Sequence, residues 1–177
     1  MNQHTRPIPD SYWVTPGRFL AGEYPGSKDD QEAQDKIRRL LDAGVTFFLD
    51  LTEAGEYNLK PYTPFLPEET TPPGRSIVHH RMPIPDGGTP SMEEMHHILD
   101  TIDRALHQGH TVYVHCWGGI GQTGTVVGCY MVGQGMTGRQ AVDEIARRRR
   151  GTPDGHRPSP ENDQQEQMIL SWLPNLS

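Results

Sequence analysis

A cysteine followed by a glycine-rich loop is the feature of this chain best suited to chemistry. Residues 111–125 read Thr-Val-Tyr-Val-His-Cys-Trp-Gly-Gly-Ile-Gly-Gln-Thr-Gly-Thr, which predicts a buried strand, a tight loop and a helix. Backbone amides in a loop that leads into a helix N-terminus bind anions, most often phosphate. The same field favours the thiolate of Cys116, which makes it a candidate nucleophile. We expect the glycines of the loop to let the backbone approach a bound group closely.

Two other glycine-loop motifs fit the segment less well. Gly119-x-Gly121-x-x-Gly124 matches a dinucleotide-binding fingerprint, but about 20 residues later Glu144 lies in a helical pattern instead of at a strand end. Too little chain follows for the remaining strand–helix units of such a domain. A nucleotide P-loop needs Gly-Lys-Ser/Thr, whereas Thr125 follows Gly124 directly. The third possibility is a cysteine phosphatase loop.

The segment 115–124 resembles the signature of the protein tyrosine and dual-specificity phosphatases, in which His-Cys, five residues, an arginine and Ser or Thr follow one another. The likeness to the small bacterial type extends from Trp13 to Trp172 and includes Ser159-Pro160-Glu161 near the end. One position departs from the signature, because Gln122 stands where the arginine belongs. The resemblance implies a three-layer α/β fold with a twisted central sheet, helices on both faces, and no metal or other cofactor.

The resemblance also implies a role for each residue of the loop. Cys116 attacks phosphorus and forms a thiophosphoryl intermediate, Thr123 bonds the sulfur and helps it leave, and His115 orients the loop from behind. The phosphoryl oxygens are held by the backbone amides of Trp117, Gly118, Gly119, Ile120, Gly121 and Gln122.

Gln122 bears directly on the activity of the chain. Its amide donates hydrogen bonds, but it carries no charge and cannot form the bidentate pair that arginine makes with two phosphoryl oxygens. Losing one donor aimed at developing charge slows an enzyme roughly 10²–10³-fold. Two explanations stay open: Gln122 is an introduced substitution that disables an active-type phosphatase, or it is natural and marks a phosphate-binding pseudophosphatase or an enzyme with another task.

A second chemical element follows the predicted strand 76–82. Residues 83–91 read Pro-Ile-Pro-Asp-Gly-Gly-Thr-Pro-Ser, and Asp86 is the only acid in this hinged loop. Phosphate transfer through cysteine needs an acid for the leaving alcohol and a base for water, and one mobile carboxylate can serve as both. An Asp-Gly pair also favours a plain turn. Its place after a strand and ahead of the helix that leads to the cysteine strand resembles that of the family's general acid, and the resemblance therefore implies this role for Asp86.

A loop as long as 52–75 in a compact domain is usually functional or mobile, and the resemblance implies that this loop shapes the substrate pocket. Its candidate rim residues are Glu56, Tyr57, Lys60 and Tyr62. The alternative for each is a solvated loop residue without a ligand role.

The remaining elements form one domain over 11–177, after a loose arm over 1–10. Two short strands, 11–14 and 18–22, precede a helix that begins at Asp29 or Asp30 and ends at Gly44, and a buried strand covers 45–51. Capping boxes begin helices at Ser91 and Thr137. The apolar stripe of the helix after Ser91 is predicted to face the core: Met92, Met95, Leu99, Ile102 and Leu106. Ser159 is expected to cap the last helix, with Pro160 at its first position.

Three further features have structural explanations. His79 and His80 are neighbours on a strand, so they point to opposite faces and cannot chelate one ion together. The arginines at 147–150 complement the dipole of a helix C-terminus, or line the pocket and attract an anionic substrate. Cys129 is expected to fill the core; the alternative is a redox partner for Cys116.

Composition excludes several classes. The net charge of −7 argues against a nucleic-acid binder, and no apolar run is long enough to span a membrane. We expect a cytoplasmic protein, where the thiol stays reduced. Three functions remain: a phosphatase of phosphorylated proteins, a phosphatase of inositol, lipid or other small phosphate esters, and a module that binds phosphorylated partners without turnover.

Overall fold

The computed structural model describes residues 5–68, 70 and 74–174. Within them, five strands form one sheet in the order β1-β2-β5-β3-β4. The strands are β1 (Ser11–Thr15), β2 (Phe19–Gly22), β3 (Phe47–Asp50), β4 (Val78–Arg81) and β5 (Val112–His115). Only the β1–β2 pair of this sheet is antiparallel. The central strand β5 ends at His115, which is in register with Gly22 on one side and Asp50 on the other.

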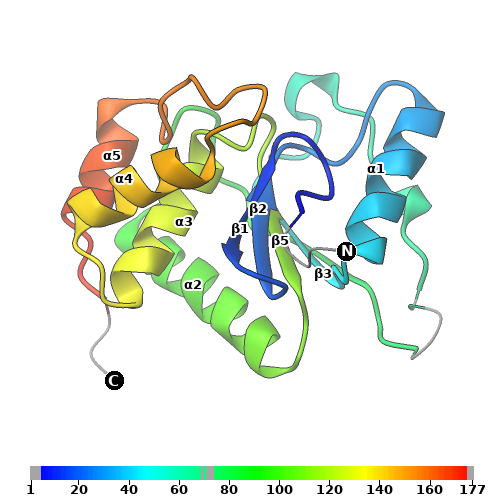
Figure 1. The fold of residues 1–177 in the computed structure, drawn as a ribbon, viewed down its shortest axis with the longest axis horizontal. Coiled ribbons are helices and arrows are strands. Elements are labelled where there is room, and N and C mark those ends of the chain that lie inside the picture. The colour runs from blue at the N-terminus through cyan, green and yellow to red at the C-terminus, as the bar shows by residue number, and fades with distance from the viewer. Residues whose placement is uncertain (1–4, 69, 71–73, 175–177) are drawn as a thin grey trace.

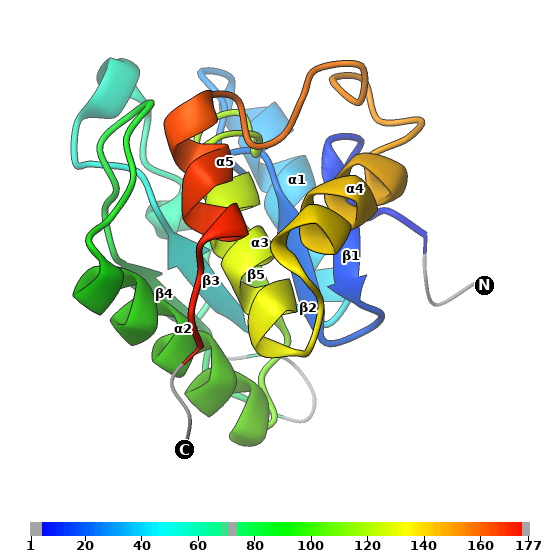
Figure 2. The same cartoon turned by 90° about the vertical axis from the view of Figure 1, so that its left-hand side faces the viewer.

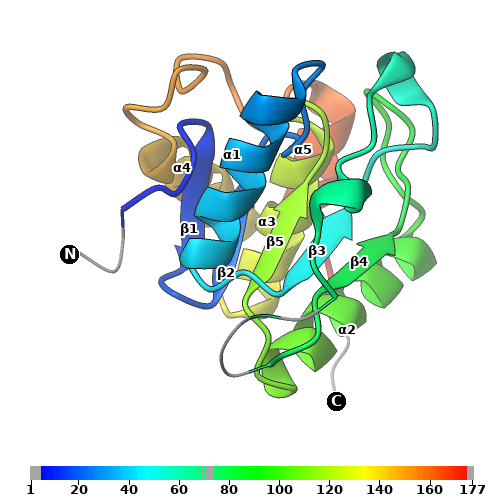
Figure 3. The same cartoon turned by 90° about the vertical axis from the view of Figure 1, so that its right-hand side faces the viewer.

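Helices cover both faces of the sheet, as the resemblance implied. They are α1 (Asp30–Asp42), α2 (Met92–His107), α3 (Gln122–Gly133), α4 (Gly138–Arg148) and α5 (Asp163–Leu170), with short 3₁₀ turns at Glu56–Asn58 and Thr63–Phe65. Helix α1 lies alone on one face, in front of the sheet in Figure 3. Helices α2 to α5 lie on the other face (Figure 2). The fold is therefore a three-layer α/β sandwich.

Two apolar clusters hold the layers together. One lies between the sheet and helices α2 to α5 and includes Met95, Ile102 and Val126. The other lies under α1 and includes Ile37 and Leu40. The predicted core stripe of α2 begins one turn too early, because Met92 is 46% exposed, whereas Met95 is fully buried.

The helix starts follow local side-chain chemistry. Asp29 accepts a hydrogen bond from the amide of Glu32, and the capping boxes at Ser91 and Thr137 are both formed. The predicted cap at Ser159 is wrong. Asn162 caps α5, and the Ser159 hydroxyl instead donates to the carbonyl of Ile120.

The chain packs against the domain before β1 begins. Ile8 is 1% exposed, and the indole of Trp13 donates to the carbonyl of Thr5. The described residues 5–10 are therefore packed, which differs from the loose arm predicted over 1–10; residues 1–4 lie outside the described chain. No helix in the described ranges has the length and apolar character needed to cross a membrane.

One edge of the sheet gathers the loops that carry the candidate site. Strands β2, β3, β4 and β5 are parallel, so the loops that follow them leave from the same edge. Figure 1 shows these loops at the top of the molecule, with the orange loop between α4 and α5 beside them. The sheet therefore brings together residues that are distant in the sequence.

Candidate active site

The loop after β5 places backbone amides around a cysteine. Cys116 is 2% exposed, and the amide of Gly119 donates to its Sγ over 3.2 Å. Among the described residues, the amides of Trp117, Gly118 and Ile120 donate to no protein acceptor. Helix α3 then begins without a side-chain cap and without an acidic residue in its first turn. Unpaired amides and the positive end of the helix dipole together favour a bound anion here.

Two glycines of the loop are required by the packing of the chain itself, and the predicted close approach of a bound group stays a prediction. Gly119 has φ +73°, and a Cβ there would lie 2.4 Å from the carbonyl carbon of Gly22. A Cβ at Gly124 would lie 2.2 Å from Oγ of Ser159. Gly118 has more room, since the nearest atom to a Cβ belongs to the side chain of Ile120 at 3.8 Å.

His115 lies fully buried behind the loop. Its Nδ1 is 3.1 Å from the carbonyl oxygen of Cys116, and its Nε2 is 2.7 Å from the hydroxyl of Tyr62. Because the carbonyl only accepts, Nδ1 carries the proton and Nε2 accepts from Tyr62. Burial lowers the pKa of His115, in agreement with a neutral ring. The pair of bonds fixes the orientation of the Cys116 peptide.

Asp50 supports the same region from the end of β3. It is fully buried and accepts hydrogen bonds from Thr52, from His79 at 2.9 Å and from Arg81 at 3.2 Å. Burial alone raises the pKa of Asp50, but the hydrogen bonds from His79 and Thr52 lower it below its ordinary value. The partner of His79 is thus a buried carboxylate, as expected of a histidine with a structural role.

Asp86 lies in the loop after β4 and reaches the loop after β5. Its Oδ1 lies 3.4 Å from Nε2 of Gln122, and its Oδ2 accepts from the hydroxyl of Tyr57. That bond is the main cause that raises the pKa of Tyr57 to about 12, so the phenol remains a donor at neutral pH. The first turn of α5 and its cap hold the acid loop, because Asn162 donates to the carbonyl of Gly87 and Gln165 to that of Gly88.

Gln122 and Thr123 begin α3 and are both buried. The Gln122 amide is the group that links the candidate acid to the cysteine loop. The Thr123 hydroxyl is enclosed and has no hydrogen-bond partner among the described residues. The bond from Thr123 to the sulfur of Cys116 therefore stays a prediction.

Of the four candidate rim residues, two line a cavity beside the cysteine loop. Tyr57 is 59% exposed and packs against Trp117 with ring centroids 5.3 Å apart, and Lys60 pairs with Asp30. Tyr62 does not belong to the rim, because it is buried and bonded to His115. Glu56 also lines neither cavity; its carboxylate accepts from the amide of Glu53.

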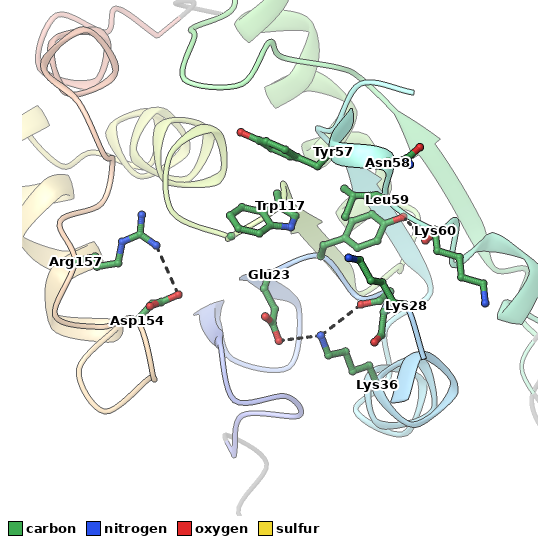
Figure 4. Close-up of a pocket in the computed structure, with 14 residues that line it drawn as sticks. Glu23, Lys28, Lys36, Tyr57, Asn58, Leu59, Lys60, Trp117, Asp154 and Arg157 are labelled. Atoms are coloured by element: carbon green, nitrogen blue, oxygen red, sulfur yellow. Dashed lines mark hydrogen bonds and ion pairs between the residues drawn. The ribbon is translucent and has the colours of Figure 1, made fainter. Parts of the chain in front are cut away.

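Two cavities meet at the loop. The smaller, of about 40 Å³, is lined by Asp86, Cys116, Trp117, Gly118, Ile120, Gly121, Gln122, Arg157 and Glu161. The larger, of about 290 Å³, shares Trp117, Gly118 and Arg157 with it. Figure 4 shows Arg157 and Asp154 on one side of the larger cavity and Lys28 on the other, with Trp117 between them. The site can hold a small anion over Cys116 and an attached group beside it.

Arg157 and Glu161 are site residues that the sequence interpretation missed. The arginine run at 147–150 was one candidate for lining the pocket, but it lines neither cavity at the cysteine loop. Arg148 donates to the carbonyls of Trp13 and Val14, and buried Arg149 donates to those of Asp154 and Arg157. These arginines have a structural role, but they hold other segments of the chain in addition to complementing the helix dipole.

Cys129 lies in the core cluster and is fully buried. Burial raises the pKa of its thiol to about 12, so it stays protonated and unreactive at neutral pH. This environment favours the packing role over the redox role.

Comparison with known proteins agrees with the geometry. The family model described as "PTP-SAK: Swiss Army Knife protein, DSP-PTPase phosphatase domain" matches residues 9–169. A putative tyrosine phosphatase 067L of Invertebrate iridescent virus 3 is 32% identical over 118 residues, covering 64% of this chain and 42% of that protein. The matched part of the chain thus spans less than half the length of this relative.

Solved structures show the same fold. A kinase associated phosphatase with serine in place of its catalytic cysteine has a TM-score of 0.71 at 19% identity, covering 90% of each chain. The phosphatase Tk-PTP in its active form has a TM-score of 0.63 at 25% identity, covering 92% of this chain and 94% of that one. With the family match over most of its length, the chain belongs to the dual-specificity and tyrosine phosphatase family, whose members are hydrolases.

Proposed function

We propose that this chain is a cysteine-dependent phosphomonoester hydrolase whose turnover is weakened by Gln122. The observation that carries the proposal is the meeting of Cys116 and Asp86 on one small cavity at the N-terminus of α3. Cys116 supplies a nucleophile, the loop amides bind an anion, and Asp86 offers a proton-transfer group that lines the same cavity.

The chemistry runs in two steps. The Cys116 thiolate attacks phosphorus, the P–S bond forms, the P–O ester bond breaks, and protonated Asp86 gives its proton to the leaving oxygen. In the second step Asp86 takes a proton from water, the new P–O bond forms, the P–S bond breaks, and the thiolate returns. Thr123 assists sulfur as the leaving group, and His115 holds the loop in place.

Gln122 weakens this chemistry because it replaces a charged fork with a neutral amide. Its Nε2 is directed to Asp86 at 3.4 Å. The cost of a lost donor to the transition state is roughly 10²–10³ in rate.

A second candidate function is a phosphate-binding module without turnover. Gln122 favours it, because the amide site can hold an anion even when the transition state lacks its charge. The two functions share the loop and differ only in whether Cys116 becomes phosphorylated.

For the substrate, we propose a phosphorylated protein side chain, with small phosphate esters such as inositol or lipid headgroups as the alternative. The exposed Tyr57 and Trp117 rings beside the small cavity favour a flat aromatic phosphoester. We also propose a cytoplasmic location, where Cys116 stays reduced, and one phosphatase domain over 11–177.

The test is hydrolysis of p-nitrophenyl phosphate by the chain and its Gln122→Arg variant, with Cys116→Ser as the blank. We expect arginine to raise kcat/KM roughly 10²–10³-fold and the blank to be inactive. If arginine restores nothing while both forms bind phosphate esters, the binding module replaces the hydrolase.

A further inference from the structure

The small cavity over Cys116 has an unusual balance of charge for a phosphate site. In the described part of the chain its lining includes two carboxylates, Asp86 and Glu161, and one cation, Arg157. The carboxylate of Glu161 lies over the start of α3, since a Cβ at Gly121 would be 2.5 Å from its Oε1. A phosphate dianion above a thiolate therefore needs a cation here, and Gln122 does not provide one.

The backbone of Arg157 is fixed against the cysteine loop. Buried Arg149 donates to the carbonyls of Arg157 and Asp154 over 2.7 and 2.8 Å. Two residues after Arg157, Ser159 donates to the carbonyl of Ile120 over 2.7 Å. The segment that carries Arg157 is thus held on both sides, and one of its anchors lies within the cysteine loop.

The side chain of Arg157, in contrast, is only weakly held. Its guanidinium lies 3.8 Å from Oδ2 of Asp154, and the two side chains are 47% and 40% exposed. An exposed ion pair of this length contributes little, so the guanidinium can turn to a bound anion at small cost. Because Arg157 lines both cavities, it lies where the phosphoryl group and the rest of a substrate would meet.

Other cations near the site are worse placed. Lys36 and Lys60 line only the larger cavity and are paired with Glu23 and Asp30. Lys28 also lines only the larger cavity (Figure 4).

We propose that Arg157 binds the phosphoryl oxygens from the α4–α5 loop and supplies the positive charge that Gln122 lacks. A planar guanidinium can pair with two of these oxygens at once, as the signature arginine does from the helix N-terminus. The inference rests on the proposed function, because it assigns the bound group to phosphate.

A four-variant cycle tests the proposal: the native chain, Arg157→Ala, Gln122→Arg and the double variant, each assayed with p-nitrophenyl phosphate. We expect Arg157→Ala to lower kcat/KM roughly 10²-fold in the native chain and less than about tenfold beside Gln122→Arg, where a second arginine is present. Arg157→Lys should retain part of the activity. An equal loss in both backgrounds, or no loss in the native chain, overturns the proposal.

Binding of orthovanadate, measured by calorimetry on the same variants, separates this proposal from the hydrolase assignment. If the native chain and Gln122→Arg both hydrolyse p-nitrophenyl phosphate no faster than the Cys116→Ser blank, the proposed function fails. Arg157→Ala is then still expected to bind vanadate at least about tenfold more weakly, and an unchanged Kd overturns the role of Arg157. The control is Arg38→Ala on α1, an arginine whose side chain is 65% exposed and pairs with Asp35; it should change neither readout. Thermal unfolding of each variant verifies its folding.

Discussion

Removing one buried hydroxyl behind the cysteine loop should destabilise the protein measurably. In Tyr62→Phe the ring remains, but Nε2 of His115 loses its partner at 2.7 Å in a fully buried position. A buried acceptor left without a partner costs about 1–3 kcal/mol. For a domain of this size, that corresponds to a fall in Tm of about 2–12 °C.

A matched variant lies on β1. The hydroxyl of Tyr12 is also buried, but it has no hydrogen-bond partner among the described residues. Tyr12→Phe removes the same atom without breaking a bond, so its free energy of unfolding should be unchanged or slightly higher.

Urea unfolding of the native chain and both variants provides the comparison. If Tyr62→Phe is as stable as Tyr12→Phe, the bond to His115 does not hold the loop, and the orienting role given to His115 loses its basis. We also expect Tyr62→Phe to lower the rate of phosphate release, because the Cys116 peptide is less firmly oriented.

Four further outcomes follow from the site. Asp86→Asn should lower kcat by about 10²–10⁴-fold for a poor leaving group and remove one limb of the pH–rate profile; an unchanged profile would assign proton transfer elsewhere. Stability should fall as pH drops below about 6.5, because burial lowers the pKa of His115 and the unfolded chain takes up the proton. Because the pKa of Asp50 is lowered in the folded protein, stability should fall further below about pH 4. In Asp50→Asn this second loss of stability should be smaller than in the native chain, as measured by urea unfolding at several pH values. Gly119→Ala should cost about 1–3 kcal/mol more than Gly17→Ala, since both have positive φ but only Gly119 meets backbone at 2.4 Å; equal costs would contradict the packing role.

Local sequence patterns predicted the parts of the fold that depend on local chemistry. The capping boxes at Ser91 and Thr137 fixed two helix starts, because a side chain and a backbone amide three residues away suffice to form them. The loop at Cys116 was recognisable for the same reason, since strand, glycines and helix are contiguous. Asp86 was located by its place between a strand and a helix.

The errors arose where a distant segment decides the environment of a residue. Tyr62 was predicted to be a rim residue of an irregular loop, but its hydroxyl is buried and hydrogen-bonded to His115, 53 positions later. Ser159 was predicted to cap a helix, but its hydroxyl donates to the carbonyl of Ile120. Arg157 was not predicted, because the hydrogen bond that ties its loop to the cysteine loop joins Ser159 to Ile120, 39 positions away in the sequence.

The most direct test of the account is to look for phosphate on Cys116 itself. The Gln122→Arg variant is mixed with p-nitrophenyl phosphate, quenched in acid within the first turnovers and digested for mass spectrometry. A thiophosphoryl group on the peptide that contains Cys116, absent from the Cys116→Ser control, is the expected result. Turnover without this adduct, or phosphate on a different residue, would contradict the nucleophilic role of Cys116.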